Sequence, residues 1–277
     1  MYTDRNIYDQ EGHLLFRKNR PGHRADENQN QRIKTLQLFS GPNAQKANPP
    51  AFDDEQKGHP AQMIRTSHIH DLFQLKDENL IERSAQILGN TINSPQNELL
   101  RHIMDTIYCL CEWVYTHSVH VALISLMIAD RLNMDEKQKE TLAAGALLHD
   151  VGKLKVPTAI LEKDSSLSDK EMALMQKHCE FGIELLAVYG LPQDVLNVVI
   201  QHHERLDASG YPNRLKSNEI SRLAKITMIA DVIDAVTSHR PYRPARSLDT
   251  AVRIVKQEGT KFCSEYVDIL DEICRKS

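Results

Sequence analysis

The sequence predicts an all-α protein: a multi-helix bundle preceded by a small N-terminal segment of β structure. From His70 onward, apolar residues recur at helical spacing, and signals for strands are nearly absent after residue 20. Helix-start signals recur in the same region, with Ser94 before Pro95 and Ser168 three residues before Glu171. The composition, 41% hydrophobic and 26% charged over 277 residues, is that of a globular protein.

The N-terminal segment, residues 1–98, differs in character from the rest of the chain. Two short apolar runs within residues 7–16 flank a turn signal and are typical of a small β element. Residues 21–62 are rich in Asn, Gln, Pro, Lys and Asp, which favours a loosely packed linker or, alternatively, a small sensory or partner-docking element. A lead-in helix then ends at Gly89. We expect a regulatory role for this segment and place the main domain at residues 99–277.

The main domain is predicted to be a succession of helices. A helix capped by Ser94 runs toward residue 132, with a break near Tyr115. Asn133 is expected to cap the next helix, which ends at His149. Further helices are expected to begin after Ser168, Pro192 and Ser221, and a last pair fills residues 248–273.

Charge and cysteine content exclude several classes of protein. The net charge of −4 argues against broad phosphate neutralisation, so we expect no direct nucleic-acid binding. The five cysteines are odd in number and include no CxxC, which favours reduced thiols in a cytosol. The longest apolar run, residues 121–129, is too short to cross a bilayer, and the first residues resemble no signal peptide. We therefore expect a cytoplasmic protein without a membrane span.

The stretch from Leu147 to Lys153 is the first candidate site. His149 and Asp150 stand side by side at the end of a close-packed apolar helix, and Gly152 is interpreted as the helix stop. One nitrogen and one oxygen ligand at a helix end suit a divalent ion such as Fe, Mn or Zn. The pair alone carries little weight, because such dipeptides occur by chance on solvated surfaces.

Further imidazoles and carboxylates recur inside or at the ends of the apolar helices, where an unpaired polar group is costly. A single buried His is usually a hydrogen-bonded core residue, but five histidines and two aspartates on successive helices are hard to satisfy except by metal. A helix bundle can aim them at one centre, and a carboxylate such as Asp150 can bridge two ions. The pattern predicts a two-metal hydrolytic site for phosphoryl chemistry. Its residues are His117, His149, Asp150, His178, His202, His203 and Asp231.

The order and spacing of these residues resemble the HD-GYP family of cyclic di-GMP phosphodiesterases, a branch of the HD metal-dependent phosphohydrolases. The resemblance spans about residues 99 to 277, and its motifs are specific as a set. The matching segments are HSVHV at 117–121, HDVGK at 149–153, KHCEFG at 177–182, HHERLD at 202–207, GYP at 210–212, IADVIDA at 229–235 and RPYR at 240–243. The family implies an HD-type helical bundle.

The resemblance also implies roles for single residues. His117, His149, Asp150 and Asp231 resemble the ligands of one ion. His178, His202 and His203 resemble those of a second ion, with Asp150 bridging; the division of the histidines is our hypothesis. Lys153 resembles a lysine that faces the reacting water or phosphate, although an exposed helix-end lysine is the alternative. Tyr211 resembles a position that contacts ligands and partners, and Arg240 and Arg243 resemble a pair that holds the phosphates and guanine of the dinucleotide.

One departure bears on the number of ions. Some family members carry a Glu one helical turn before the first His, where it helps to hold a third ion; this chain has Trp113 there, and Glu112 points elsewhere. A second departure, Ala208 where Gly is common, puts little in doubt. We therefore predict two divalent ions, with Fe or Mn favoured and Zn, Ni or Mg also compatible. A two-ion centre favours linear pGpG over GMP as the main product.

Alternatives remain at this stage. The chain could be an HD-GYP module that senses the dinucleotide, or docks GGDEF-domain proteins through Gly210, Tyr211 and Pro212, with little turnover. It could also hydrolyse another cyclic dinucleotide, and a homodimer is compatible with the sequence. The intact ligand set favours the enzyme.

Overall fold

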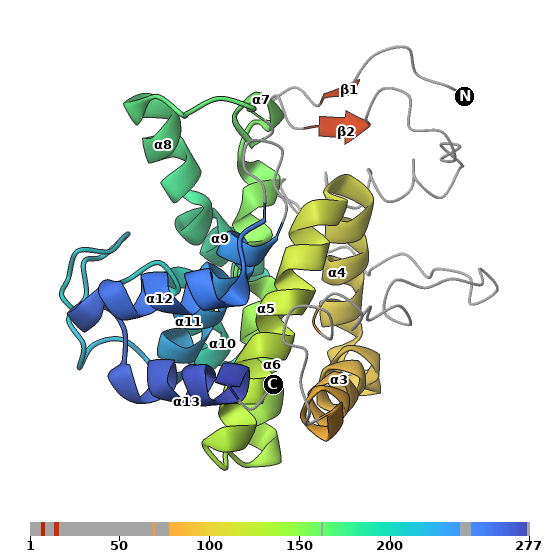
Figure 1. Ribbon diagram of the computed structural model, residues 1–277. Coiled ribbons are helices and arrows are strands. Elements are labelled where there is room, and N and C mark those ends of the chain that lie inside the picture. Colours follow the sequence, from red (N-terminus) through yellow and green to blue (C-terminus); the bar gives the residue numbers. More distant parts are fainter. Residues whose placement is uncertain are drawn as a thin grey trace.

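A computed structural model describes residues 78–161, 163–238 and 245–275, together with Ile69 and two short strands near the N-terminus. The strands β1 (Ile7–Tyr8) and β2 (Leu14–Phe16) pair antiparallel, as the sequence predicts. The remaining regular elements of the described chain are all helices, and the all-α prediction is confirmed (Figure 1).

The helices follow one another with short connections. The α-helices are α3 (Glu78–Asn93), α4 (Glu98–Leu110), α5 (Glu112–Arg131), α6 (Glu136–Leu148), α7 (Thr158–Leu161), α8 (Asp169–Gln176), α9 (His178–Leu186), α10 (Gln193–Gln201), α11 (Arg222–Thr237), α12 (Leu248–Gln257) and α13 (Ser264–Arg275). The 3₁₀ helices are η3 (Pro95–Asn97), η4 (Val151–Lys155), η5 (Ala187–Tyr189) and η6 (Gly259–Lys261).

Helix α5 lies at the centre of the bundle. It packs against α6 and α11 and also contacts α3 and α4, which lie on the other side of it from α11, α12 and α13 (Figure 1). Every residue from His117 to Ala129 is buried, as expected for a helix enclosed by others. Two of these central positions are occupied by His117 and His120, so polar groups enter the core at a defined place.

Helix α3 belongs to the same core. It packs against α5 and α6, and its side chains Leu80, Ile81 and Leu88 are fully buried among the residues of the main bundle. Arg83 of α3 also pairs with Asp130 of α5 at 3.0 Å. None of the described helices is long and apolar enough to span a bilayer.

Several predicted helix starts are confirmed and others are wrong. Ser94, Ser168 and Ser221 each accept a hydrogen bond from the first turn of the helix that follows, and Pro192 precedes α10. Asp135, not Asn133, caps α6, because its carboxylate accepts a hydrogen bond from the backbone N–H of Gln138.

Two predicted helix ends are also corrected. The break expected near Tyr115 lies at Cys111, whose extended backbone separates α4 from α5. Helix α3 continues past Gly89 to Asn93, because Ile92 still packs into the core. The described cysteines Cys111, Cys179, Cys263 and Cys274 are in no disulfide.

Gly152 does not stop a helix by a left-handed turn, as the sequence analysis supposed; it permits a close crossing. Helix α6 ends at Leu148, and Gly152 lies inside η4, which packs against α9. A Cβ atom at residue 152 would stand 1.8 Å from the carbonyl oxygen of His178 and 2.4 Å from the backbone nitrogen of Gly182. The crossing therefore brings the start of α9 against the residues that follow α6.

Candidate metal centre

The seven predicted ligands come from five places in the bundle and meet at one centre. His117 lies in the first half of α5, and Asp231 lies in the middle of α11. His149 and Asp150 follow α6, and His178 opens α9. The remaining pair, His202 and His203, follows α10. Six of the seven are buried and His203 is half-buried.

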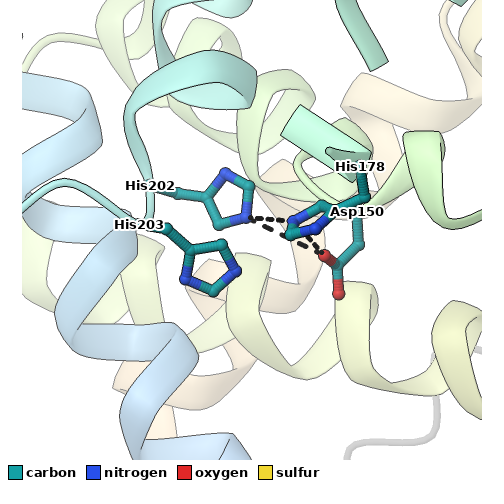
Figure 2. A group of neighbouring side chains, drawn as sticks. All are labelled: Asp150, His178, His202 and His203. Carbon is teal, nitrogen blue, oxygen red and sulfur yellow. Dashed lines mark hydrogen bonds and ion pairs between the residues drawn. The ribbon is translucent and has the colours of Figure 1, made fainter. Parts of the chain in front are cut away.

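The ligand atoms form two groups, each with its atoms within 4.8 Å of one another. One group contains His117, His149 and Asp231. The other contains Asp150, His178, His202 and His203, and Figure 2 shows these four side chains converging. The histidines and Asp231 fall into the sets that the sequence analysis proposed, whereas Asp150, assigned there to the first ion and as the bridge, groups with the second set.

Asp150 stands between the two groups. Its Oδ2 atom lies 3.4 Å from Nε2 of His117 and 3.3 Å from Nε2 of His149. Its Oδ1 atom lies 3.4 Å from Nε2 of His178 and 3.8 Å from Nε2 of His202. Each oxygen thus faces a different set of imidazoles, which is the arrangement that a bridging carboxylate requires.

His149, His178 and His202 present Nε2 to the centre because Nδ1 of each ring is hydrogen-bonded elsewhere. A carbonyl oxygen can only accept, so an Nδ1 atom bonded to it carries the proton and Nε2 keeps its lone pair. Three Nδ1 atoms meet backbone carbonyls three residues earlier: His149 to Ala146 at 2.6 Å, His178 to Met175 at 2.7 Å and His202 to Val199 at 2.9 Å.

This donor set fits divalent ions. Nε2 of His178 and Nε2 of His202 are 3.2 Å apart, although both lone pairs point into the gap. Two nitrogens bound to one ion at about 2.1 Å stand roughly 3.0–3.4 Å apart, so a cation relieves the repulsion without rearrangement. Among the described residues, Nε2 of His149 and Oδ1 of Asp150 are buried without a hydrogen bond of normal geometry, and both face the centre.

Comparison with known proteins identifies the fold around this centre. A family model for the HD domain matches residues 71–263. The chain belongs to the HD-domain family. A solved HDG"Y"P protein from Bdellovibrio bacteriovorus shares the fold of this HD domain, with a TM-score of 0.54 at 20% identity, covering 76% of this chain and 78% of that one.

The curated relatives that match this HD domain include phosphodiesterases of cyclic dinucleotides. A cyclic di-GMP phosphodiesterase of Pseudomonas aeruginosa is 34% identical over 203 residues, which are 73% of this chain and 45% of the relative. A 3'3'-cGAMP-specific phosphodiesterase of Vibrio cholerae is 33% identical over 184 residues, 65% of this chain and 35% of the relative. The chain spans less than half the length of these two relatives. The matches confirm the resemblance to HD-GYP domains that the motifs predict.

In the HD-domain centre, ion pairing decides the pKa shifts of Asp150, Asp231 and His117. Burial acts to raise the pKa of Asp150, but Lys153 and His149 outweigh it and hold that pKa well below its usual range. The pKa of Asp231 is likewise lowered: burial opposes the shift, and the hydrogen bond from His117 drives it. Burial lowers the pKa of His117, but Asp231 and Asp234 outweigh it and raise the value to about 9. The first group therefore holds a tightly paired imidazole.

The second group is different, because burial dominates there. Burial lowers the pKa of His178 to about 4. Burial, followed by repulsion from neighbouring imidazoles, also holds the pKa values of His202 and His203 well below their usual range. These three rings are neutral at neutral pH, which is the form that binds metal ions.

Lys153 and Trp113 flank the centre. The ammonium of Lys153 donates a hydrogen bond of 2.5 Å to Oδ2 of Asp150, so it is not the exposed helix-end lysine of the alternative interpretation. The same ammonium lies 5.5 Å from the centre of the Trp113 ring, a cation–π contact. The Trp113 ring therefore lines one side of the site, whereas the side chain of Glu112 is exposed.

Tyr211 is held against the second group by a tightly folded loop. Its ring stacks on His203, with ring centres 4.7 Å apart and planes inclined by 27°. A Cβ atom at Gly210 would stand 2.5 Å from the backbone of Glu204 and Arg205, so only Gly permits this close approach. Ala208 has a φ of 63°, in the left-handed region that Gly adopts more easily, which explains why Gly is common there. Arg240 and Arg243 lie outside the described residues.

Sequence reasoning missed three supporting residues. Asp234 accepts hydrogen bonds from Nδ1 of His117 at 2.6 Å and from Nδ1 of His120 at 2.9 Å. Glu204, which is fully buried, accepts from the backbone N–H groups of Asn213 at 2.7 Å and Leu215 at 2.9 Å. The signal for Asp234 and His120 was spacing: each follows a predicted ligand by three residues on the same helix, and so shares its face.

Proposed function

We propose that this chain is a metal-dependent phosphodiesterase that hydrolyses cyclic di-GMP to linear pGpG. The observation that carries the proposal is the position of Asp150, whose two oxygens face two separate sets of imidazoles. Such a centre suits the in-line displacement of a phosphodiester, and the names of the curated relatives support a cyclic dinucleotide as the substrate.

In this proposal the histidines and aspartates bind two divalent ions, with Asp150 shared between them. When bound, the ions would supply Lewis-acid stabilisation of the phosphoryl oxygens and a nucleophile at neutral pH. Mixed nitrogen and oxygen donors favour Fe or Mn, while Zn, Ni or Mg remain compatible.

The other site residues act on the substrate side. Lys153, paired with Asp150 and held beside Trp113, supplies a positive charge at the edge of the centre, where a phosphate oxygen would lie. Tyr211 offers an aromatic edge next to His203. Arg240 and Arg243 are proposed to hold the phosphates and a guanine of the dinucleotide through their planar guanidinium groups.

A second substrate has specific support, because a relative at 33% identity is named for 3'3'-cGAMP. The two dinucleotides share the phosphodiester ring and differ in one purine. We therefore propose cyclic di-GMP as the first substrate to test and the mixed dinucleotide as the second.

We also propose, from the sequence patterns, how the protein is regulated and which partners it binds. Within the predicted regulatory segment, residues 1–98, the part that precedes α3 would carry the regulation, because α3 packs into the main bundle. Residues 210–212 would offer a docking point for GGDEF-domain proteins. A homodimer and a cytoplasmic location are also proposed.

The test uses protein purified anaerobically and reconstituted with Mn²⁺ or Fe²⁺. Cyclic di-GMP and 3'3'-cGAMP are supplied separately, and the products are separated by liquid chromatography. We expect faster loss of cyclic di-GMP, accumulation of pGpG, and no turnover by Asp150→Ala. Binding of the dinucleotide by fully metallated protein without turnover would instead favour a sensing module, and faster cleavage of 3'3'-cGAMP would reassign the substrate.

A further inference from the structure

We propose that Asp234 is the positioning residue that makes His117 a metal ligand, and that it controls the affinity of only one of the two ions. The inference rests on the proposed function, because it assumes that both groups bind metal. It concerns the group formed by His117, His149 and Asp231.

His117 is oriented differently from His149, His178 and His202. The rings of His149, His178 and His202 are fixed by backbone carbonyls, which no substitution removes. Nδ1 of His117 instead bonds to a side chain, Oδ2 of Asp234, at 2.6 Å. The direction in which His117 points Nε2 therefore depends on one replaceable carboxylate.

The carboxylate of Asp234 is buried, and both of its oxygens are hydrogen-bonded. It is 1% exposed and lies one turn after Asp231 on α11, so a ligand and the group that orients a ligand share one helix face. Its second oxygen, Oδ1, accepts from Nδ1 of His120 at 2.9 Å and from the hydroxyl of Ser238 at 2.9 Å. Both oxygens are engaged, and the carboxylate ties the centre of α5 to α11.

Loss of this carboxylate has a local consequence. Without it the His117 ring can rotate and its Nδ1–H is left buried without an acceptor, while His149 and Asp231 keep their places. Removal of a group that orients a ligand typically lowers metal affinity by about 10–100-fold. The group of Asp150, His178, His202 and His203 is oriented by other contacts, so its affinity is expected to stay within about twofold.

The experiment is a calorimetric titration of metal-free full-length protein with Mn²⁺, with metal content after dialysis measured by mass spectrometry. Wild type is expected to take up two ions. Asp234→Ala should retain one at wild-type affinity and bind the other 10–100-fold more weakly. Asp234→Asn preserves the shape but can accept from only one ring, and should show a smaller loss at the same ion.

The matched control is Asp130→Ala, which removes a carboxylate that also joins its helix to others, to α3 through Arg83 at 3.0 Å and to α6 through Lys139 at 3.1 Å, but lies outside the centre. It should lower thermal stability and leave both affinities unchanged. Nitrogen-15 NMR of the histidine rings provides a second readout, in which the Nδ1–H signal of His117 should move in both Asp234 variants.

Three results would overturn the inference. One is wild-type binding of both ions by Asp234→Ala. Another is equal weakening of both ions, which would indicate a general structural role. The last is an unchanged His117 signal in Asp234→Asn. If wild-type protein bound no metal, the proposed function would fail, and this inference with it.

Discussion

Replacing Gly152 by Ala tests how the fold sets the metal centre. The new Cβ atom would stand 1.8 Å from the carbonyl oxygen of His178, whereas real Cβ contacts are essentially never below 3.0 Å. Because the obstacle is backbone, η4 and the start of α9 must move apart by roughly 1 Å, and overpacking of this kind typically costs about 1–3 kcal/mol. Metal–ligand distances tolerate only about 0.2 Å, so His178 would leave its ion.

The assay combines a thermal unfolding scan with a titration of metal-free protein. Gly152→Ala should unfold at a lower temperature and lose the ion of the His178 group while the His117 group keeps its own. Gly259→Ala is the control. Ala is disfavoured there as well, but by a backbone φ of 58°, and the new Cβ atom would meet no neighbouring atom. Unchanged binding of both ions by Gly152→Ala, at unchanged stability, would refute the reasoning.

Three further predictions address the substrate side, the loop and pH. The double variant Arg240→Ala, Arg243→Ala should raise the Michaelis constant without loss of metal, since each charged hydrogen bond contributes about 1.5–3 kcal/mol; unchanged affinity for substrate would exclude this role. Glu204→Ala leaves two backbone N–H groups without their acceptor and should lower the melting temperature and loosen Tyr211, as followed by calorimetry and substrate affinity; a stable variant with normal affinity would contradict it. In metal-free protein the pKa of His178 is lowered to about 4 from 6.5, so the unfolded state binds more protons between these values, and stability should fall as pH drops from 6.5 toward 4; thermal scans that show constant or rising stability across that window would disprove it.

The seven candidate ligands could be singled out from the sequence because each places a group that is costly to bury inside or at the end of an apolar helix. His117 and Asp231, for example, lie among fully buried neighbours on different helices and face each other across 3.1 Å. The family resemblance then suggested how the histidines divide, and the distances between the ligand atoms group the histidines in the same way.

The missed features depend on contacts that a linear pattern does not encode. Gly152 was interpreted as a helix stop because a Gly after a helix is compatible with two structures. It can adopt the left-handed conformation that ends a helix, or it can leave room for another backbone to pass close by, and the sequence pattern is the same in both cases. Glu204 bonds to backbone groups nine and eleven residues later, and backbone donors leave no mark in the sequence. The break lies at Cys111, whose backbone is not helical, and the weak helix formers near Tyr115 remain inside α5.

The central claim, two ions held by seven side chains, is tested most directly by an anomalous-scattering map of crystals of the metallated protein, with metal quantified in the same preparation. Two full-occupancy peaks are predicted, one among His117, His149 and Asp231 and one among the remaining histidines, with the Asp150 carboxylate between them. Trp113 should form the wall beside them without contacting either ion. A single peak, or a third full-occupancy ion held by Glu112, would contradict the account, and the third ion would also remove the reason for expecting pGpG rather than GMP.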